Sequence, residues 1–257
     1  DLVPEAAVSL NPKIRGWRDQ RVWVIGASTG IGAAIARDLV NAGARVALSA
    51  RSRGRLDAIA EGTDAIVAPL DITDRASVLA TATKVGDALG RLDLVIVVAG
   101  THSPMRADRF DRAKADQLLA VNLVGPLNCL EAVLPTLLAQ RGGGIALVAS
   151  VAGYRGLPQA LIYGPTKAAL IHLAEGLYLD LRRHGIGVYL VNPGFVDTPL
   201  TARNDFRMPN LISADEAAAE ILAGLRAGRF EIHFPRAFTR KLKLLQLLPY
   251  RLYFAAV

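Results

Sequence analysis

Tyr163 and Lys167 stand four residues apart in the stretch YGPTK, at the start of a helix-like run. Side chains four positions apart on a helix lie on one face, one turn from each other. A free tyrosine has a pKa of about 10, too high for efficient proton exchange at neutral pH, but a nearby ammonium favours its anion. The pair predicts a phenol that acts as an acid/base. Pro165, between the two, fits only if the helix has just begun.

The stretch GASTGIG, residues 26–32, places three glycines between the apolar run RVWVI and another helix-like run. Glycine permits a positive φ in a tight turn and a close approach of the backbone to a ligand, while the N–H groups of the following helix attract phosphate. Gly26, Gly30 and Gly32 therefore predict a site for the pyrophosphate of a dinucleotide. A plain tight turn is the alternative.

The elements that must position these residues follow from the hydrophobic pattern. Short β-branched runs alternate with helix-length amphipathic stretches in most of the chain; the runs are RVWVI, ARVALSA, DAIVAPL, LDLVIVVAG, GGIALVAS, GVYLVN and RFEIHF. This alternation predicts a Rossmann-like, doubly wound α/β fold, with a seven-stranded, mostly parallel sheet and helices on both faces. Ser213 and Glu216 predict a capping box on the helix before the last strand. Ligands of such sheets bind beyond the carboxyl ends of the strands, which is where GASTGIG, VVAG, VAS and VNPG occur.

The ordered motifs resemble those of the short-chain dehydrogenase/reductase family, from about Arg21 to Phe234. The family's first turn commonly reads T-G-x-x-x-G-x-G, with Ile25 here in place of the threonine, and NPGFVDT is similar to its P-G-x-V-x-T segment. Asp71, Asn122, Ser150, Tyr163 and Lys167 also match. VVAG stands where the family usually has N-N-A-G, so the hydrogen bonds of two asparagines must come from elsewhere or be absent.

The resemblance implies roles for these residues. Tyr163 would donate the proton in carbonyl reduction while a nicotinamide delivers hydride, and the oxidised, cationic nicotinamide would further favour the tyrosinate. Lys167 would also bind the nicotinamide ribose, and Ser150 would hydrogen-bond the substrate oxygen. Asn122 would hold a water in the proton relay to Lys167; an asparagine bonded to its own backbone at a kink is the alternative. The cofactor-binding set implied is Gly26, Ser28, Thr29, Gly30, Ile31, Gly32, Asp71, Ile72, Ala99, Gly100, Tyr163, Lys167, Pro193, Gly194, Val196 and Thr198.

The choice of nicotinamide cofactor rests on the stretch SARSRGRL after the second strand, which lacks the carboxylate typical of family members that prefer NAD. Arg51 predicts a contact with the 2′-phosphate of NADP(H), with a hydroxyl added by Ser49 or Ser52, and NAD(H) is disfavoured. A solvated arginine at the start of a helix is the alternative. Asp71, with the backbone of Ile72, is similar to the acid that holds the adenine. It could instead cap the next helix, although Thr73 or Asp74 is better placed.

Other catalytic classes lack their signatures. The sequence contains no G-x-S-x-G elbow, and its four histidines show no metal-ligand spacing, so we expect neither a serine hydrolase nor a metal. His102, which follows VVAG, is expected in a surface loop, and a residue lining the substrate pocket is the alternative. The single cysteine, Cys129, lies in an apolar run, which predicts a buried, inert thiol and a reducing compartment.

The net charge of +7 belongs mostly to the C-terminal end, where seven Lys or Arg and one acid lie from Arg226 to Val257. No nucleic-acid-binding motif accompanies this charge, so a nucleic-acid partner is not expected. The expected organisation is an N-terminal extension over residues 1–20, a catalytic domain over 21–234 and a basic, apolar tail over 235–257. The tail is too short and too charged to span a bilayer; it could contact a membrane surface or pack on its own domain or on a partner subunit.

The segment Pro199–Ser213 occupies the position of the family's substrate loop. Its apolar residues with two arginines predict an apolar pocket with positive charge at the mouth; they are Leu200, Phe206, Met208, Leu211 and Ile212, with Arg203 and Arg207. We therefore expect an NADP-dependent oxidoreductase that interconverts a carbonyl and an alcohol, cytoplasmic or membrane-peripheral, and a homodimer or homotetramer. The alternatives are a 3-oxoacyl-thioester reductase and a non-catalytic NADP-binding regulatory protein.

Overall fold

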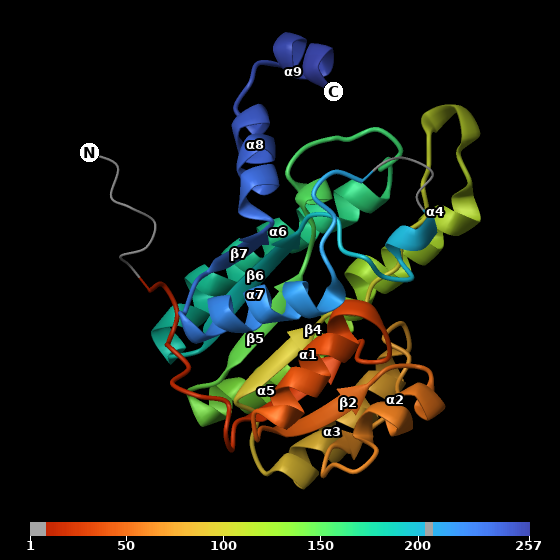
Figure 1. The fold of residues 1–257 in the computed structure, drawn as a ribbon. Helices are drawn as coiled ribbons and strands as arrows, with labels where there is room; N and C mark the ends of the chain where they lie inside the picture. Colours follow the sequence, from red (N-terminus) through yellow and green to blue (C-terminus); the bar gives the residue numbers. More distant parts are fainter. Residues whose placement is uncertain (1–8, 204–207) are drawn as a thin grey trace.

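The strands form a single parallel sheet in the order β3-β2-β1-β4-β5-β6-β7 (Figure 1). This is the order in the computed structural model, which describes residues 9–203 and 208–257. The seven strands described are β1 (Arg21–Ile25), β2 (Arg45–Ser49), β3 (Ile66–Val67), β4 (Leu94–Val97), β5 (Gly144–Val148), β6 (Gly187–Pro193) and β7 (Glu231–Phe234). The predicted doubly wound fold is confirmed, and the strand order reverses between β1 and β4, where a ligand site is expected.

Helices cover both faces of the sheet, which explains why the strands read as continuous apolar runs rather than alternating ones. One core contains Ile35, Leu39 and Leu222; it packs helices α1 (Gly30–Asn41), α2 (Arg53–Ala60) and α7 (Ala214–Arg226) on one face. The other contains Val85, Val133 and Leu170, from helices α3 (Arg75–Leu89), α5 (Gly125–Gln140) and α6 (Tyr163–Leu181). Successive residues of β1 alternate between the two cores, as the pleat requires.

Side-chain caps fix several of these helix starts. The Asp74 carboxylate accepts a hydrogen bond from the Ser77 N–H and caps α3, so Asp71 is not the cap. The predicted capping box of Ser213 and Glu216 is present at the start of α7. These caps satisfy N–H groups that the first helical turns leave without a backbone partner.

One continuous helical run, Arg112–Gln140, contains α4 (Arg112–Leu119), a π-helical segment at Ala120–Val124, and α5. In the part of the chain that is described, this run alone is long and apolar enough to cross a bilayer by length and composition. Its residues Cys129, Val133 and Leu137 are buried in the core against the sheet, so it serves as a core helix. The buried position of Cys129 is as expected, and burial raises the pKa of its thiol to about 12.

The two ends of the chain differ in how they meet the domain. Asn11 exchanges two hydrogen bonds with the backbone of Val188, at 2.7 and 2.9 Å, which holds the N-terminal segment against the end of the sheet. At the other end, helices α8 (Arg236–Gln246) and α9 (Tyr250–Ala256) follow β7 and project from the carboxyl edge of the sheet (Figure 1).

Candidate active site

The glycine-rich turn between β1 and α1 is packed so closely that two of its glycines admit no side chain. A Cβ on Gly32 would lie 2.1 Å from the Gly26 carbonyl oxygen, and one on Gly26, whose φ is 103°, would lie 2.4 Å from the Ala99 nitrogen. No side chain caps the first turn of α1, which also carries no acid. The turn therefore offers N–H groups and the positive end of a helix dipole to an anion, and it fits the pyrophosphate of a dinucleotide.

Two further segments predicted to bind the cofactor lie beside this turn. A Cβ on Gly30 would lie 2.9 Å from the Thr198 methyl group, which places the segment after β6 against the start of α1. A Cβ on Gly100 would lie 3.6 Å from the Lys167 ammonium. Ser28, Thr29 and Ile31 are partly exposed in the turn, and Pro193, Gly194 and Val196 end or follow β6.

Backbone hydrogen bonds hold the VVAG segment at the end of β4, where valines stand in place of the family's asparagines. The Val98 and Ala99 N–H groups both donate to the Ile25 carbonyl, at 2.8 and 2.9 Å. These bonds continue the β1–β4 ladder past its last paired residues and hold Gly100 at the carboxyl edge.

Asp71 and Arg51 lie at the end of the site where the adenosine is expected. The Asp71 carboxylate accepts bonds from the Thr73 N–H and hydroxyl, at 2.9 and 2.8 Å; the backbone bond, more than the Arg51 charge, lowers the pKa of Asp71. Arg51 is exposed just after β2. Ser49 is fully buried, and its hydroxyl donates to the Ala68 carbonyl and accepts from the Trp23 indole. The prediction that Ser49 could contact the cofactor is therefore wrong, and Ser52 is the remaining hydroxyl.

The structure brings Ser150, Tyr163 and Lys167 together beyond the ends of β5 and β6. Ser150 follows β5, and its hydroxyl accepts a bond from the Ala152 N–H at 3.1 Å while contacting the Tyr163 phenol. Tyr163 is the first residue of α6, so Pro165 falls in the first turn, as the sequence requires. The Lys167 ammonium lies 5.7 Å from the centre of the Tyr163 ring and donates to the Val148 carbonyl at 3.0 Å.

Burial dominates the electrostatics of this pair. Desolvation raises the pKa of Tyr163 to about 12, although the bond from Ser150 acts in the opposite direction. Desolvation also lowers the pKa of Lys167 to about 8. The expected lowering of the tyrosine pKa therefore does not arise from the protein groups alone, because removal of the phenol from water outweighs the hydrogen bond from Ser150.

Asn122 lies fully buried in the π-helical segment and bonds to a different part of the chain. Its side chain accepts from the Thr101 N–H at 2.8 Å and donates to the Thr101 carbonyl at 2.9 Å. It also donates to the Thr166 hydroxyl at 3.4 Å, and that hydroxyl donates to the Tyr163 carbonyl. Asn122 thus ties the loop after β4 to the first turn of α6, and the alternative of an asparagine bonded to its own backbone is wrong.

Sequence reasoning missed one residue of the site, Gly153, and gave a place in the pocket for another, His102, only as the alternative. His102, expected in a surface loop, packs edge-on against the Tyr163 ring, with the ring centres 4.7 Å apart. Gly153 lies where a Cβ would be 2.6 Å from the Lys167 carbonyl carbon, so its lack of a side chain lets the turn after Ser150 contact α6. The nearness of His102 to the VVAG motif was a usable signal, whereas nothing in the sequence singled out Gly153.

The segment expected to hold the substrate is described in part. Met208 and Ile212 are partly buried, and Val196 pairs with Ile212 in an isolated bridge, so this segment returns to the site after β6. Phe206, Arg207 and the Arg203 side chain lie outside the described residues. Among those that are described, no group of three metal-ligating side chains occurs.

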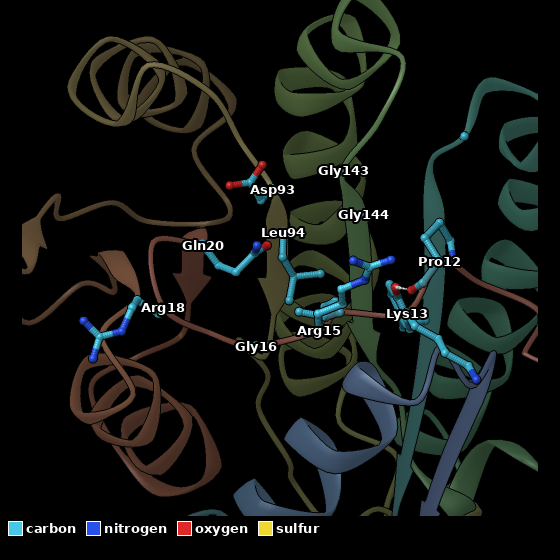
Figure 2. A pocket seen from close by; sticks show the side chains of 13 residues that line it. Pro12, Lys13, Arg15, Gly16, Arg18, Gln20, Asp93, Leu94, Gly143 and Gly144 are labelled. Atoms are coloured by element: carbon cyan, nitrogen blue, oxygen red, sulfur yellow. Dashed lines mark hydrogen bonds between the residues drawn. The ribbon is translucent and has the colours of Figure 1, made fainter.

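A separate cavity of about 480 Å³ lies at the opposite edge of the sheet (Figure 2). Figure 2 shows Lys13, Arg15 and Gln20 of the N-terminal segment beside Asp93 and Gly144, which stand at the amino ends of β4 and β5. Parallel strands carry their ligands at the carboxyl edge. This cavity is therefore distinct from the site around Tyr163.

The short chain dehydrogenase family profile matches residues 20–207. The chain belongs to this family. An uncharacterized oxidoreductase from Staphylococcus epidermidis is 35% identical over 204 residues, covering 79% of this chain and 89% of that protein. One from Myxococcus xanthus is 33% identical over 238 residues, covering 91% and 94%. The chain is thus an oxidoreductase of the short-chain dehydrogenase family, whose members generally bind NAD(P)(H).

Two solved structures have similar folds. A short-chain dehydrogenase/reductase mutant from Serratia marcescens superimposes with a TM-score of 0.76 at 25% identity, covering 85% of this chain and 98% of that one. A ribose-5-phosphate isomerase from Brucella melitensis gives 0.78 at 28% identity, covering 84% and 92%. The differing names of these two proteins illustrate that a shared fold does not fix the reaction, which has to be argued from the site.

Proposed function

We propose that this short-chain dehydrogenase interconverts a carbonyl and an alcohol with NADP(H), using Tyr163 as its acid/base. The observation that carries the proposal is the cluster of Ser150, Tyr163 and Lys167 beside the glycine-rich turn. When bound, the reduced nicotinamide supplies a hydride to the carbonyl carbon. The chain must then bind the carbonyl oxygen and deliver one proton to it.

The residues of the cluster divide these tasks. The Ser150 hydroxyl, which contacts the phenol, can hydrogen-bond the substrate oxygen as negative charge develops on it. The Tyr163 phenol then donates its proton to that oxygen. The phenol is protonated at neutral pH, because burial raises its pKa, so it carries the proton that the substrate oxygen takes up. The Lys167 ammonium stabilises the tyrosinate that remains, and the Asn122 contacts with Thr101 and Thr166 support the relay that returns a proton.

NADP(H) is favoured over NAD(H) by the charge around Arg51. The guanidinium is exposed after β2, and the stretch from Ser49 to Leu56 contains no acid. Ser52 precedes α2 without capping it, which leaves its hydroxyl for a phosphate. The ratio of kcat/KM for NADPH and NADH tests this preference: the Arg51→Ala change should lower the value for NADPH at least about tenfold and leave that for NADH nearly unchanged.

The proposed substrate is an apolar carbonyl compound, because Leu200, Met208, Leu211 and Ile212 follow the segment that contacts the glycine-rich turn. Arg207 and the side chain of Arg203, which raised the alternative of an acyl thioester, lie outside what the structure describes. A homodimer or homotetramer and a cytoplasmic location remain predictions. Leu119, Val124 and Leu127 are exposed on the 112–140 helix and would be covered by a second copy, which sedimentation velocity would detect.

The decisive experiment is to measure NADPH oxidation with a panel of aldehydes, ketones and acyl thioesters for the wild type and Tyr163→Phe. An enzyme of the proposed kind loses about two to four orders of magnitude in kcat, because the proton donor is absent. NADPH affinity, measured by fluorescence titration, should change little and thereby shows that the variant is folded. A wild-type protein that binds NADPH but reduces no member of the panel would support the non-catalytic alternative.

A further inference from the structure

The C-terminal helices α8 and α9 present large apolar side chains to solvent. Leu244 is 67% exposed, Leu247 80%, Tyr250 70% and Phe254 71%. Tyr250 and Phe254 are four residues apart on α9 and their rings stack, so they lie on one face of the helix. We call these four residues the tail patch. Four large, exposed apolar side chains within eleven residues of the chain indicate an interaction site, since single exposed apolar residues scattered over a surface need no such explanation.

Specific contacts hold the tail on the domain, so the patch belongs to a structured segment and is nevertheless exposed. The Arg155 guanidinium donates to the carbonyls of Leu245, Gln246 and Leu248, at 3.1, 3.1 and 2.6 Å. It also lies 4.0 Å from the centre of the Tyr253 ring, and the Tyr253 hydroxyl donates to the Gly156 carbonyl. The inner side of the tail is thereby fixed to the segment after Ser150 and its outer side is left to solvent.

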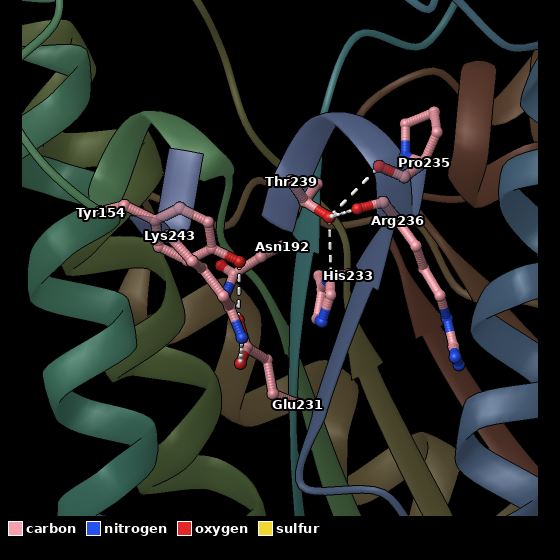
Figure 3. A network of polar contacts seen from close by, with 8 residues as sticks. All are labelled: Tyr154, Asn192, Glu231, His233, Pro235, Arg236, Thr239 and Lys243. Carbon is pink, nitrogen blue, oxygen red and sulfur yellow. Dashed lines mark hydrogen bonds and ion pairs between the residues drawn. The ribbon is translucent and has the colours of Figure 1, made fainter. Parts of the chain in front are cut away.

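Polar contacts along α8 anchor this helix in the same way (Figure 3). Figure 3 shows Lys243 of α8 and Tyr154 both directed at the Glu231 carboxylate of β7, and the Thr239 hydroxyl bonded to the His233 ring at 2.6 Å. Thr239 and Lys243 are four residues apart, so both lie on the inward face of α8. Leu244 is exposed on a different side of this helix, and the exposed Leu247 follows its last turn.

The charge of the tail indicates what covers the patch. Residues 235–257 contain five basic side chains and no acid, and Arg236, Arg240, Lys241 and Arg251 are exposed. A symmetric contact between two tails would bring like charges together without acids to pair them. An anionic bilayer surface pairs each cation, with about 1 kcal/mol for each Lys or Arg near it, and takes up the apolar side chains.

We propose that the tail patch docks on the surface of an anionic lipid bilayer as a peripheral anchor. The helices project from the carboxyl edge of the sheet (Figure 1). Ser150, which follows β5 and contacts the Tyr163 phenol, lies at the same edge. Two loops at this edge carry further exposed apolar residues, Phe110 and Leu161, and are joined by the bridge between Met105 and Ala160. Docking therefore brings the entrance of the site to the lipid surface.

Cosedimentation of the full chain with vesicles tests the proposal. Wild-type protein should bind phosphatidylcholine vesicles that contain phosphatidylserine, bind pure phosphatidylcholine vesicles more weakly, and dissociate as salt is added. The Leu247→Ser, Phe254→Ser double variant should bind at least about tenfold more weakly to the anionic vesicles, because both side chains lose apolar contact with lipid. Leu179→Ser is the matched control: Leu179 is 61% exposed but lies on α6 outside the patch, and its replacement should have no effect.

Activity in solution separates this proposal from the proposed function. The double variant should keep the wild-type rate of NADPH oxidation with a water-soluble substrate, since neither side chain contacts the catalytic cluster. Equal vesicle binding by the wild type and the double variant, or no binding to anionic vesicles at all, would overturn the proposal. So would a double variant that changes the oligomeric state instead of lipid binding, because the patch would then be covered by a second copy.

Discussion

Lys167 places an ammonium group in the interior of the protein, where a charge destabilises the folded state. The side chain is buried, and its nitrogen donates to the Val148 carbonyl at 3.0 Å. Desolvation disfavours the charged form and lowers the pKa of Lys167 to about 8 from its ordinary value of 10.5. The lysine proposed to stabilise the tyrosinate therefore weakens the folded state when no cofactor is bound, as functional residues commonly do.

The effect of Lys167 on stability should depend on pH in a defined direction. Between pH 8 and 10.5 the unfolded chain holds a proton on this lysine that the folded chain has lost, so unfolding free energy rises with pH in this window. Lys167→Met removes the dependence. We expect the variant, free of cofactor, to be more stable than the wild type by about 2–3 kcal/mol below pH 8, with the difference shrinking toward pH 10.5.

Urea denaturation at a series of pH values measures this difference, and Lys84→Met is the control because Lys84 is exposed on α3. The control should match the wild type at every pH. A constant difference between Lys167→Met and the wild type across the window would contradict the assigned burial cost and would point to a packing effect of the methionine alone.

At the scale of single residues, the sequence predicted the site residues that belong to recognisable motifs. It did not predict contacts that depend on the course of a loop. Ser150, Tyr163 and Lys167 were found because their types and spacing are chemically distinctive. The contact of His102 with the Tyr163 ring depends on the course of the loop after β4, which no local pattern specifies. The prediction for Ser49 was wrong for a different reason. Its position at the end of β2 suited a cofactor contact, but its hydroxyl is hydrogen-bonded to Trp23 and Ala68 inside the sheet.

At the scale of elements, Ser150 is positioned by the packing of the short helical turn Val151–Gly153 on α6. Gly153 makes this packing possible, because a Cβ there would lie 2.6 Å from the Lys167 carbonyl carbon and 2.7 Å from the Ala168 nitrogen. Backbone atoms in a helix cannot give way as a flexible side chain can. The contact therefore sets the separation between Ser150 and the first turn of α6.

The Gly153→Ala change should push the turn away from α6 and displace Ser150 from Tyr163. We expect kcat to fall about 10- to 100-fold and stability to fall by about 1–3 kcal/mol, while NADPH affinity changes little. Steady-state kinetics and thermal denaturation measure these effects. Gly176→Ala is the matched control on α6: an added Cβ meets nothing within 4 Å there, and the change should stabilise the helix by up to about 1 kcal/mol with activity intact. Full activity in Gly153→Ala would show that Ser150 does not depend on this contact.

The strands were predicted from their local hydrophobic pattern, whereas the π-helical segment was not. All seven strands were found because buried parallel strands read as apolar runs, although β3 retains only Ile66 and Val67. The π-helical segment around Asn122 was not foreseen, since the bonds from Asn122 to Thr101 that accompany it join residues distant in the sequence. An asparagine within an apolar helix signalled a special position but not its geometry.

At the scale of the whole molecule, the Glu231 carboxylate connects the sheet, the segment after Ser150 and the C-terminal tail. It accepts bonds from the Tyr154 hydroxyl at 2.6 Å and the Asn192 amide at 2.9 Å, and it pairs with Lys243 of α8 (Figure 3). Burial alone would raise the pKa of Glu231, but the bonds from Lys243, Tyr154 and Asn192 hold it below its usual value. The charged carboxylate is therefore the form that holds the tail on the domain.

This linkage predicts how pH and mutation loosen the tail. Because the pKa of Glu231 is lower in the folded state, the stability contributed by its carboxylate is complete above the ordinary glutamate value of 4.5 and is lost as pH falls through the folded value. Glu231→Gln removes the charge at every pH and should weaken the attachment of α8 and α9 by about 1–3 kcal/mol. Hydrogen exchange of the tail amides, corrected for intrinsic rates, should be faster in the variant at pH 7. The wild type should approach the variant as pH drops below 4.5, whereas exchange in the central strands should differ little between the two. Equal protection of the tail in both proteins at pH 7 would show that the hydrogen bonds from Arg155 hold the tail without the carboxylate.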